Sequence, residues 1–286
     1  SFTGDVPESN NTSSASVTAI LRPYPDLVVA NLAATPASLQ TGEDVTVSWR
    51  VNNVGTDQVA ADFRQRVRIV HGTTGQTLVD TTVLYDAAVG GAIAASDGRD
   101  QSVVIAIPDG TSSMGDLEIT VTADTFNDVF EFNGAGTAET NNSAVTAVTT
   151  TLAPYPDLAV SNVTAPAQTI ADPATVTVSW HVENLETAAA EPTGWFDAVI
   201  ASTDETIGNG DDRVLARFER SAALQPGASY DRSETFQLPP SLTGRFYLYV
   251  QADRDAGVFE DGREANNAAR APNFFDVMPI PYADLV

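Results

Sequence analysis

The sequence predicts an all-β protein with two tandem β-sandwiches, and three observations support this prediction. The 286 residues are enough for two domains of about 150 residues each. A sequence repeat recurs along the chain at a spacing of about 130 residues. Short segments with alternating hydrophobic residues lie within each copy, and no amphipathic helix of three turns is evident. Units of this length with about seven short strands predict immunoglobulin-like or fibronectin-type-III-like topology.

The repeat is marked by the segment PYPDL, which occurs at residues 23–27 and again at 154–158, and by a related PYADLV at 281–286. A Glu-x-Asn-Asn element closes each copy at residues 139–142 and 264–267, and another stands at residues 8–11. We therefore expect residues 1–22 to be the tail of a preceding repeat, 23–153 the first full repeat, 154–280 the second, and 281–286 the start of a following one.

The strands that we expect at the centre of each copy lie at residues 45–51 and 176–182, with a further one at 246–250. Trp49 and Trp180 occupy the same place in the two copies and alternate in phase with neighbouring valines. Since alternate residues of a strand point to the same face, both tryptophans should lie in the sandwich cores.

The composition excludes several functions. The 14 basic residues are all arginine and face 38 acidic residues, for a net charge of −24, so a nucleic-acid partner is not expected. No stretch approaches the roughly 18 apolar residues that a membrane span requires, so we expect no membrane insertion. Cysteine is absent, which excludes disulfides, thiolate metal sites and cysteine nucleophiles.

The second copy resembles the CARDB repeat, a cell-adhesion-related domain of large bacterial exported proteins. The resemblance rests on the segments PYPDLAVSNV, TVSWHVEN, WFDAVIASTD, LQPGASY, LPPSLTGRFYLYVQAD and VFEDGREANN. The first copy is more divergent, with Phe63 near the place of Trp195. The resemblance implies immunoglobulin-like modules in surface adhesins or secreted enzymes, an extracellular location at the bacterial cell surface, and no catalytic activity.

The residues themselves also argue against an enzyme. The histidines are His71, beside a predicted turn, and His181, which follows Trp180 and so points to the opposite face of its strand. Arg50 stands in the first copy where His181 stands in the second. No nucleophile-elbow, zincin or phosphate-loop motif is present.

An acidic loop near the end of each copy predicts a calcium site, because calcium takes six to eight oxygen ligands in irregular geometry. If this loop joins the last two strands, it lies at the pole where the chain begins the sandwich, beside the PYPDL aspartates. Asp197, taken as part of the loop after the Trp-bearing strand, is expected at the same pole. The candidate metal ligands are Asp124, Asp128, Glu131, Glu139 and Asp26 in the first copy, and Asp253, Asp255, Glu260, Glu264 and Asp157 in the second. The alternative is a solvated acidic turn. A second group, Asp204, Asp211 and Asp212, is interpreted as a plain turn.

These observations favour a non-catalytic extender segment of a large bacterial surface adhesin or exoprotein, stabilised by calcium. The expected partners are neighbouring repeats of the same chain, with a cell-surface or glycan ligand bound elsewhere in the parent protein. One alternative is a glycan- or protein-binding module, whose aromatic surface would comprise Trp195, Phe196, Tyr247 and Tyr249. Another is a spacer within a secreted hydrolase.

Overall fold

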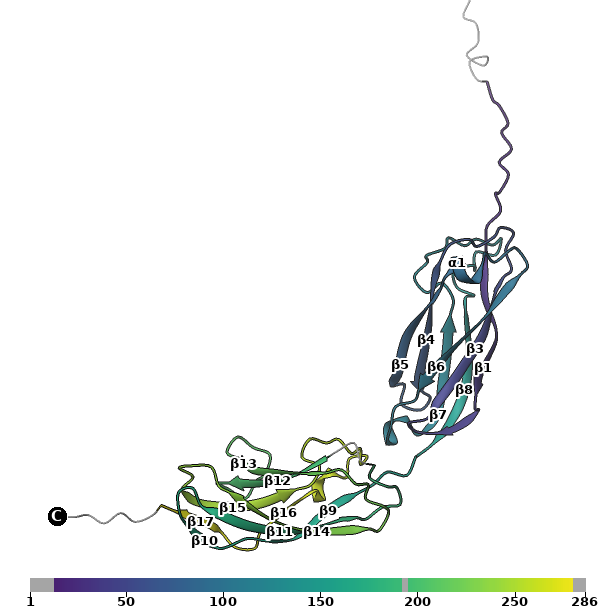
Figure 1. Ribbon diagram of the computed structural model, residues 1–286. Helices are drawn as coiled ribbons and strands as arrows, with labels where there is room; N and C mark the ends of the chain where they lie inside the picture. Colours follow the sequence, from purple (N-terminus) through teal and green to yellow (C-terminus); the bar gives the residue numbers. More distant parts are fainter. Residues whose placement is uncertain (1–12, 192–194, 280–286) are drawn as a thin grey trace, which may run out of the picture. The chain divides into compact units, whose positions relative to one another are not determined.

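A computed structural model describes residues 13–191 and 195–279 and shows an almost entirely β-stranded chain (Figure 1). The chain divides into two compact units, the first comprising Ser1–Pro108 with Ser113–Thr151 and the second Asp109–Ser112 with Leu152–Val286. Residues 13–22 form no helix or strand and are exposed. The Glu-x-Asn-Asn element at 8–11 and the expected repeat start at 281–286 lie outside the described residues.

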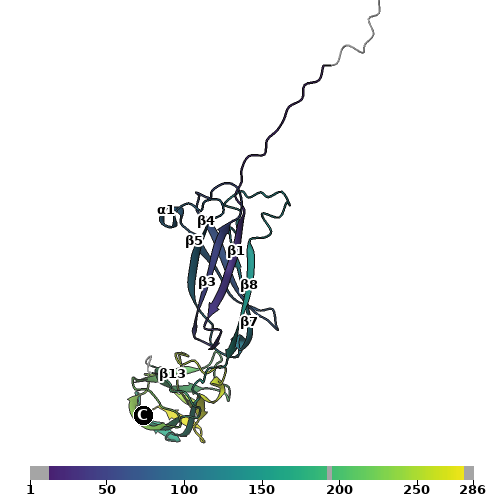
Figure 2. The same cartoon turned by 90° about the vertical axis from the view of Figure 1, so that its right-hand side faces the viewer.

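The first unit is a sandwich of a three-stranded and a five-stranded sheet (Figure 2). The smaller sheet has the order β1 (Leu27–Thr35), β3 (Asp44–Asn53), β6 (Gly98–Ala106). The larger has the order β2 (Ser38–Gln40), β8 (Ser143–Thr151), β7 (Gly115–Thr122), β4 (Phe63–His71), β5 (Thr77–Tyr85). One short helix, α1 (Ala87–Gly90), follows β5, and its N-terminus is capped by the Asp86 carboxylate.

Alternation along β3 places its apolar residues in the core of this first sandwich. Val45, Val47, Trp49 and Val51 are buried, whereas the residues between them are exposed or half-buried. The prediction for Trp49 is therefore confirmed. Its indole Nε1 donates a 2.7 Å hydrogen bond to Oε1 of the buried Gln65 on β4, which satisfies the one polar atom of that side chain.

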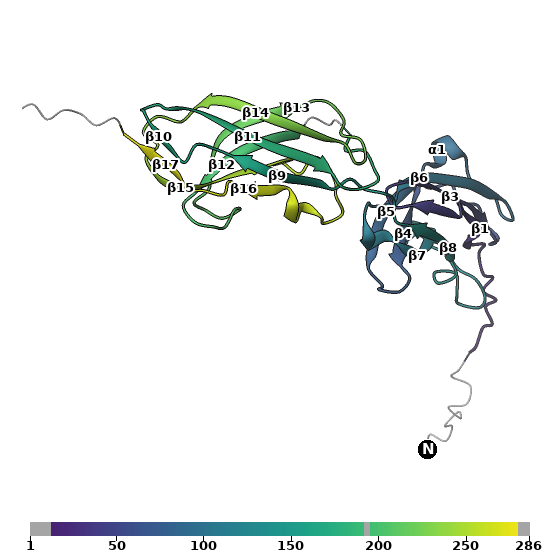
Figure 3. The same cartoon turned by 90° about the horizontal axis from the view of Figure 1, so that it is seen from below.

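The second unit repeats this arrangement (Figure 3). Its smaller sheet has the order β14 (Ser229–Gln237), β11 (Thr175–Asn184), β9 (Leu158–Thr164). Its larger sheet has the order β10 (Gln168–Ile170), β17 (Phe275–Met278), β15 (Gly244–Gln251), β12 (Trp195–Ser202), β13 (Arg213–Arg220), and β16 (Ala268–Arg270) also pairs with β15. Two 3₁₀ turns lie at Thr111–Ser113 and Glu264–Asn266.

Both units have the strand order of an immunoglobulin-like β-sandwich, as predicted. In each unit the middle strand of the smaller sheet, β3 or β11, pairs with the first strand on one side and with β6 or β14 on the other, and the remaining strands form the opposite sheet. Within the described residues, no helix has the length and apolar character needed to cross a membrane.

The core of the second unit confirms one prediction and corrects two. Trp180 is buried, as expected. Trp195 is 1% exposed and belongs to the same core, so it cannot contribute to an exposed aromatic surface. Asp197, considered a carboxylate of the loop pole, is fully buried on β12 and accepts a 3.0 Å hydrogen bond from Trp180 Nε1. The physical reason is strand alternation, which puts residues 195 and 197 on the same inward face.

Candidate metal centre

The loop between β7 and β8, residues 123–142, brings three carboxylates together in the first unit. Single oxygens of Asp124, Glu131 and Glu139 all lie within 4.8 Å of one another. Asp124 and Glu131 are buried, whereas Glu139 is exposed. The group therefore reaches from the sandwich interior to solvent.

Asp124 organises the start of this loop. Its backbone has φ of +45°, in the left-handed region that aspartate tolerates better than most residues. Its carboxylate turns back to accept hydrogen bonds from the N–H groups of Asp128 (2.7 Å) and Val129 (2.9 Å). Burial raises the pKa of Asp124, and the backbone donors oppose that shift only in part.

Glu131 ties the loop to the beginning of the sandwich. Its Oε2 accepts a 2.5 Å hydrogen bond from the backbone N–H of Leu27, and its Oε1 accepts a 3.0 Å bond from Asn142 Nδ2. Burial raises the pKa of Glu131 to about 8, and the charges of Glu139 and Asp124 add to the increase. Its described hydrogen-bond donors are thus a backbone N–H group and an amide, both neutral.

Glu139 completes the group from the solvent side. Its Oε1 accepts a 2.9 Å hydrogen bond from the backbone N–H of Glu131. A small cavity of about 110 Å³ adjoins the cluster and is lined in part by Asp124, Glu139 and Asn142. An ion can thus approach the carboxylates from solvent.

The second unit builds the same cluster from Asp253, Glu260 and Glu264, whose oxygens also lie within 4.8 Å of one another. Asp253 again has φ of +45° and accepts from the N–H groups four and five residues later, at 2.9 and 2.8 Å. Glu260 Oε2 accepts a 2.7 Å bond from the N–H of Leu158. Burial raises the pKa of Glu260 to about 7 and also raises that of Glu264.

Two asparagines at the ends of the acidic loops were missed by sequence reasoning. Asn142 donates through Nδ2 to Glu131, and Asn267 donates through Nδ2 to Glu260 (2.8 Å) and Glu264 (2.8 Å). Both side chains are nearly fully buried, yet the Oδ1 atom of each has no hydrogen-bond partner. A buried amide oxygen without a donor is costly, and a cation would satisfy it. The recurring Glu-x-Asn-Asn element, which ends in these two asparagines, is the sequence signal that could have identified them.

Asp26 and Asp157 lie beside the clusters rather than within the three-carboxylate groups. Asp26 accepts hydrogen bonds from Asn133 Nδ2 and Asn141 Nδ2, both at 2.9 Å. Asp157 accepts a 2.8 Å bond from Asn266 Nδ2. Both aspartates are buried and fasten the acidic loop to the segment that leads into the sandwich.

Asp128 and Asp255 are engaged elsewhere, each by an arginine. Arg64 pairs with Asp128 at 2.7 Å and lowers its pKa, and Arg217 pairs with Asp255. The structure places neither aspartate in the three-carboxylate groups. Sequence alone could not show this, because Arg64 is 64 residues from Asp128 and comes from β4, the neighbour of the strand that precedes the loop.

The remaining polar clusters have structural explanations. Asp211 Oδ2 accepts from the N–H of Thr203 (2.7 Å), and Asp204 Oδ1 accepts from that of Thr206 (2.7 Å), as in an aspartate-braced turn. His181 lies 2.9 Å from Asp231 on the outer face of its sheet. The contacts of Asp204 and Asp211 agree with the interpretation of this group, which includes the segment GNGDD at residues 208–212, as a plain turn.

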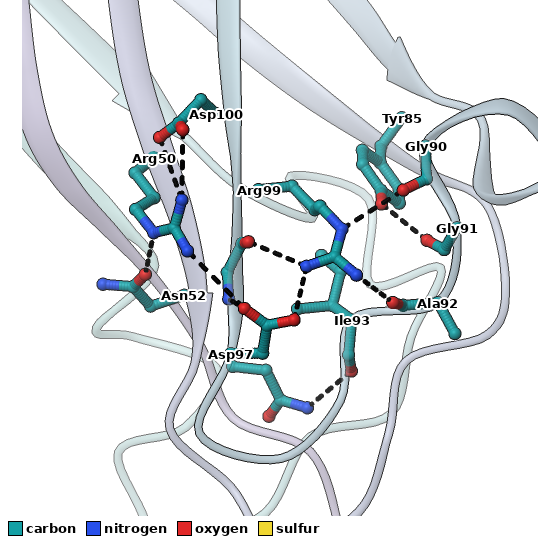
Figure 4. Close-up of polar contacts among 12 residues, drawn as sticks. Arg50, Asn52, Tyr85, Gly90, Gly91, Ala92, Ile93, Asp97, Arg99 and Asp100 are labelled. Carbon is teal, nitrogen blue, oxygen red and sulfur yellow. Dashed lines mark hydrogen bonds and ion pairs between the residues drawn. The ribbon is translucent and has the colours of Figure 1, made fainter.

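A network of arginines links β3 and β6 to the segment after α1 in the first unit. Figure 4 shows Arg50 and Arg99 converging on Asp97, at 3.5 and 2.5 Å. Arg50 also binds Asp100, and Arg99 donates to the carbonyl oxygens of Gly90 and Ala92, next to the end of α1. The charges within this network are balanced, and it holds the helix against β6.

The two acidic clusters can each hold a metal ion. Calcium–oxygen distances are about 2.3–2.6 Å, so two ligands of one ion lie at most about 5 Å apart, in agreement with the 4.8 Å limit found here. The donor sets contain oxygen alone, which favours hard cations over zinc or copper.

Comparison with known families identifies the modules. The CARDB family model matches residues 24–146 and again residues 155–271. The chain belongs to the CARDB family. CARDB modules are non-catalytic domains of a structural or adhesion-related kind and occur in exported bacterial proteins. No curated protein matches the chain.

Similar solved structures include a CARDB domain from Pyrococcus furiosus. Its crystal structure, in complex with di-metal ions, is 22% identical, covers 47% of this chain and 100% of that one, and has a TM-score of 0.33. A solution structure of the same domain is 22% identical over 46% of this chain and 100% of that one, with a TM-score of 0.32. Red sea bream transglutaminase is 13% identical over 91% of this chain and 32% of the enzyme, with a TM-score of 0.27.

Proposed function

We propose that the chain is a non-catalytic extender segment of a large bacterial surface adhesin or exoprotein, and that calcium stabilises each CARDB module. The observation that carries the proposal is the duplicated cluster. In both units a buried glutamate bonds the first residue of the first strand while facing two further carboxylates and an unpartnered asparagine oxygen. A cation there would join the acidic loop to the beginning of the sandwich.

Electrostatics favour an ion in these clusters. Three carboxylates within 4.8 Å repel one another in a partly buried site, and the described hydrogen-bond donors to Glu131 and Glu260 are neutral backbone and amide groups. A divalent cation converts this repulsion into attraction. Calcium suits the site better than magnesium, since magnesium demands near-octahedral geometry at about 2.0–2.1 Å and keeps several waters.

The test is thermal unfolding of the chain in EDTA and in millimolar calcium, with sodium chloride matched for ionic strength. At a hundredfold excess over the dissociation constant, one bound ion adds about 2.7 kcal/mol to the free energy of unfolding. We expect a rise in Tm of several degrees for each module. Sodium screens charges without bridging them and should not reproduce the increase. Equal melting curves in EDTA and calcium would contradict the proposal.

Matched variants locate the effect. Glu139→Gln and Glu264→Gln remove a charge from the solvent side of each cluster, and we expect each to abolish the calcium response of its own module. Asp128→Asn is the control, because that residue binds Arg64 outside the cluster. A calcium response that Asp128→Asn abolishes and Glu139→Gln preserves would place the ion elsewhere.

The extender role rests on the tandem modules and on the structural or adhesion-related character of the CARDB family. We infer that the partners of the chain are neighbouring repeats and that its parent protein is exported. Antibodies raised against this segment should label intact cells of the source bacterium without permeabilisation. Labelling that requires permeabilisation would contradict an extracellular location.

A further inference from the structure

The outer face of the larger sheet in the second unit carries a depression of about 320 Å³, a volume at the lower end of the range for ligand sites. It is lined by Glu205, Tyr247, Arg270, Ala271, Pro272, Asn273 and Phe274. We propose that this depression binds a neutral carbohydrate. The proposal is independent of the metal centre, which lies at the end of the sandwich formed by the acidic loop.

Two aromatic rings and one guanidinium group line the depression, and a second guanidinium group packs on one of the rings. The rings of Tyr247 and Phe274 pack with centroids 4.9 Å apart. Arg270 lies over Tyr247 and Arg245 over Phe274, each 4.9 Å from the ring centroid. Phe274 is 43% exposed, so part of its ring is open to a ligand. The partly exposed ring of Phe274 thus offers an apolar contact next to hydrogen-bond donors of Arg270.

The charges at this depression are balanced, which selects the class of ligand. Glu205 pairs with Arg270 at 3.1 Å, and Asp276 pairs with Arg245 at 2.8 Å. No uncompensated positive charge is left for an anion, and the net charge of −24 repels anions from the whole chain. A sugar ring fits instead, because its C–H face packs on an aromatic ring while adjacent hydroxyls accept from arginine and donate to carboxylate.

The first unit provides a comparison within the same chain. A depression of about 360 Å³ lies at the equivalent place and is lined by Glu118, Val145, Thr146 and other residues. Strand pairing aligns the two: Thr120 pairs with Val145 on β7 and β8, as Tyr249 pairs with Arg270 on β15 and β16. Val145 thus corresponds to Arg270, and Glu118 corresponds to Tyr247. Both units have a depression at this place, but only that of the second unit is lined by aromatic rings and an arginine.

Two backbone differences bring the remaining groups into place. Strand β8 is continuous in the first unit, whereas residues 271–274 separate β16 from β17 in the second and carry Asn273 and Phe274. An interruption of this kind changes the direction in which the side chains at the break point. The loop after β12 spans residues 203–212 and supplies Glu205, whereas the corresponding loop after β4 spans only residues 72–76.

The longer loop is held in a defined shape. Tyr249 donates a 2.8 Å hydrogen bond from its hydroxyl to the carbonyl oxygen of Glu205. Asp211 and Asp204 brace the same loop through the backbone bonds described above. The acidic GNGDD segment therefore has a role, which is to fix Glu205 opposite Arg270. Preorganised polar groups lower the entropic cost of binding.

The test is an NMR titration of the whole chain with the methyl glycosides of glucose, galactose, mannose and N-acetylglucosamine, in parallel with glucuronic acid. We expect saturable shifts of the amide signals of Tyr247, Arg270, Asn273 and Phe274 with at least one neutral glycoside. Arg270→Val, which copies the first unit, and Phe274→Ala should each weaken binding at least about tenfold. Glu118→Gln in the first unit is the control and should change nothing.

Three results would overturn the proposal. One is the absence of saturable shifts with every neutral glycoside. The second is binding that neither Arg270→Val nor Phe274→Ala weakens. The third is binding of glucuronic acid alone, which would show that an anion and not a neutral sugar occupies the site. Because Phe274 is exposed, its truncation should leave the fold intact and keep the test valid if Arg270→Val does not fold.

Discussion

The carboxylate of Glu131 accepts a 2.5 Å hydrogen bond from the backbone N–H of Leu27, a residue 104 positions earlier in the chain. Glu260 makes the equivalent bond with Leu158 in the second unit, at 2.7 Å. Leu27 begins β1 and Leu158 begins β9, so in each module one buried carboxylate links the loop before the last strand to the first residue of the first strand. The metal centre and the beginning of the sandwich are thus parts of a single structure.

A first prediction separates the structural role of Glu131 from its role toward a metal. Glu131→Ala leaves the N–H of Leu27 and Nδ2 of Asn142 buried without an acceptor, at about 1–3 kcal/mol for each group. Glu131→Gln keeps an acceptor but removes the charge. In EDTA we expect the alanine variant to lose at least about 2 kcal/mol and the glutamine variant much less, whereas both lose the calcium response.

The measurement is hydrogen exchange of peptides from the first unit, followed with and without calcium. Peptides of the second unit, whose cluster is unchanged, are the control. A glutamine variant that keeps the full calcium response would show that the charge of Glu131 is not needed for the ion.

A second prediction concerns pH. The pKa of Glu131 is raised from 4.5 to about 8 and that of Glu260 from 4.5 to about 7, so between these limits the folded chain binds more protons than the unfolded chain. The stability that these groups contribute is fully present below pH 4.5 and is lost as the pH rises toward 7 and 8. In EDTA, the contribution of the clusters to Tm should therefore fall as the pH rises from 4.5 to about 8.

Calcium should reverse that trend, because the ion competes with protons for the same oxygens and binds better as the pH rises. The increase in Tm caused by calcium should be larger at pH 8 than at pH 5. A calcium effect of equal size at both values would indicate that the ion binds groups already ionised at pH 5, outside the buried glutamates.

The fold could be predicted from the sequence because its signals are local and duplicated. Alternation of Trp49 and Trp180 with valines marks the core strands, and the repeat sets the number of sandwiches. The metal site could be predicted only as a set of loop carboxylates. Which carboxylates meet depends on arginines that are distant in sequence, since Arg64 takes Asp128 and Arg217 takes Asp255.

Errors arose where a residue type was given more weight than its strand position. Trp195 and Asp197 stand two residues apart on one strand, and the alternation rule that placed Trp180 inward also places both inward. An aromatic residue suggested a binding surface and an aspartate suggested a solvated loop. Asp197 can be buried because Tyr230, Trp180 and Arg232 surround its carboxylate. These partners are distant in the sequence, so the residues next to Asp197 do not predict them.

A third prediction tests the core. Trp180 is 2% exposed, stacks near Phe218 and donates through Nε1 to Asp197. Trp180→Ala removes a large buried side chain and should lower the free energy of unfolding by about 3–5 kcal/mol. Trp180→Phe retains most of the volume and should cost less. Chemical denaturation monitored by circular dichroism gives both values, and a melting temperature unchanged by the alanine variant would contradict the core assignment.

The last prediction compares the polar partners of the two core tryptophans. Trp49 donates to the neutral Gln65, whereas Trp180 donates to Asp197, whose pKa is raised by burial despite hydrogen bonds from Trp180 and Tyr230 and the charge of Arg232. A raised pKa means that the stability contributed by Asp197 is present below its unfolded pKa of 3.8 and is lost as the pH rises through its folded value.

Asp197→Asn removes this titration and keeps an oxygen for Trp180 Nε1. We therefore expect the variant to match the wild type near pH 4 and to exceed its stability at pH 7, as measured by urea unfolding at both values. Gln65→Glu should do the reverse in the first unit, where it introduces a buried charge and should destabilise the fold increasingly as the pH rises. If Asp197→Asn proves less stable than the wild type at pH 7 and equal to it at pH 4, the ion pair with Arg232, at 3.6 Å, outweighs the cost of burying the carboxylate.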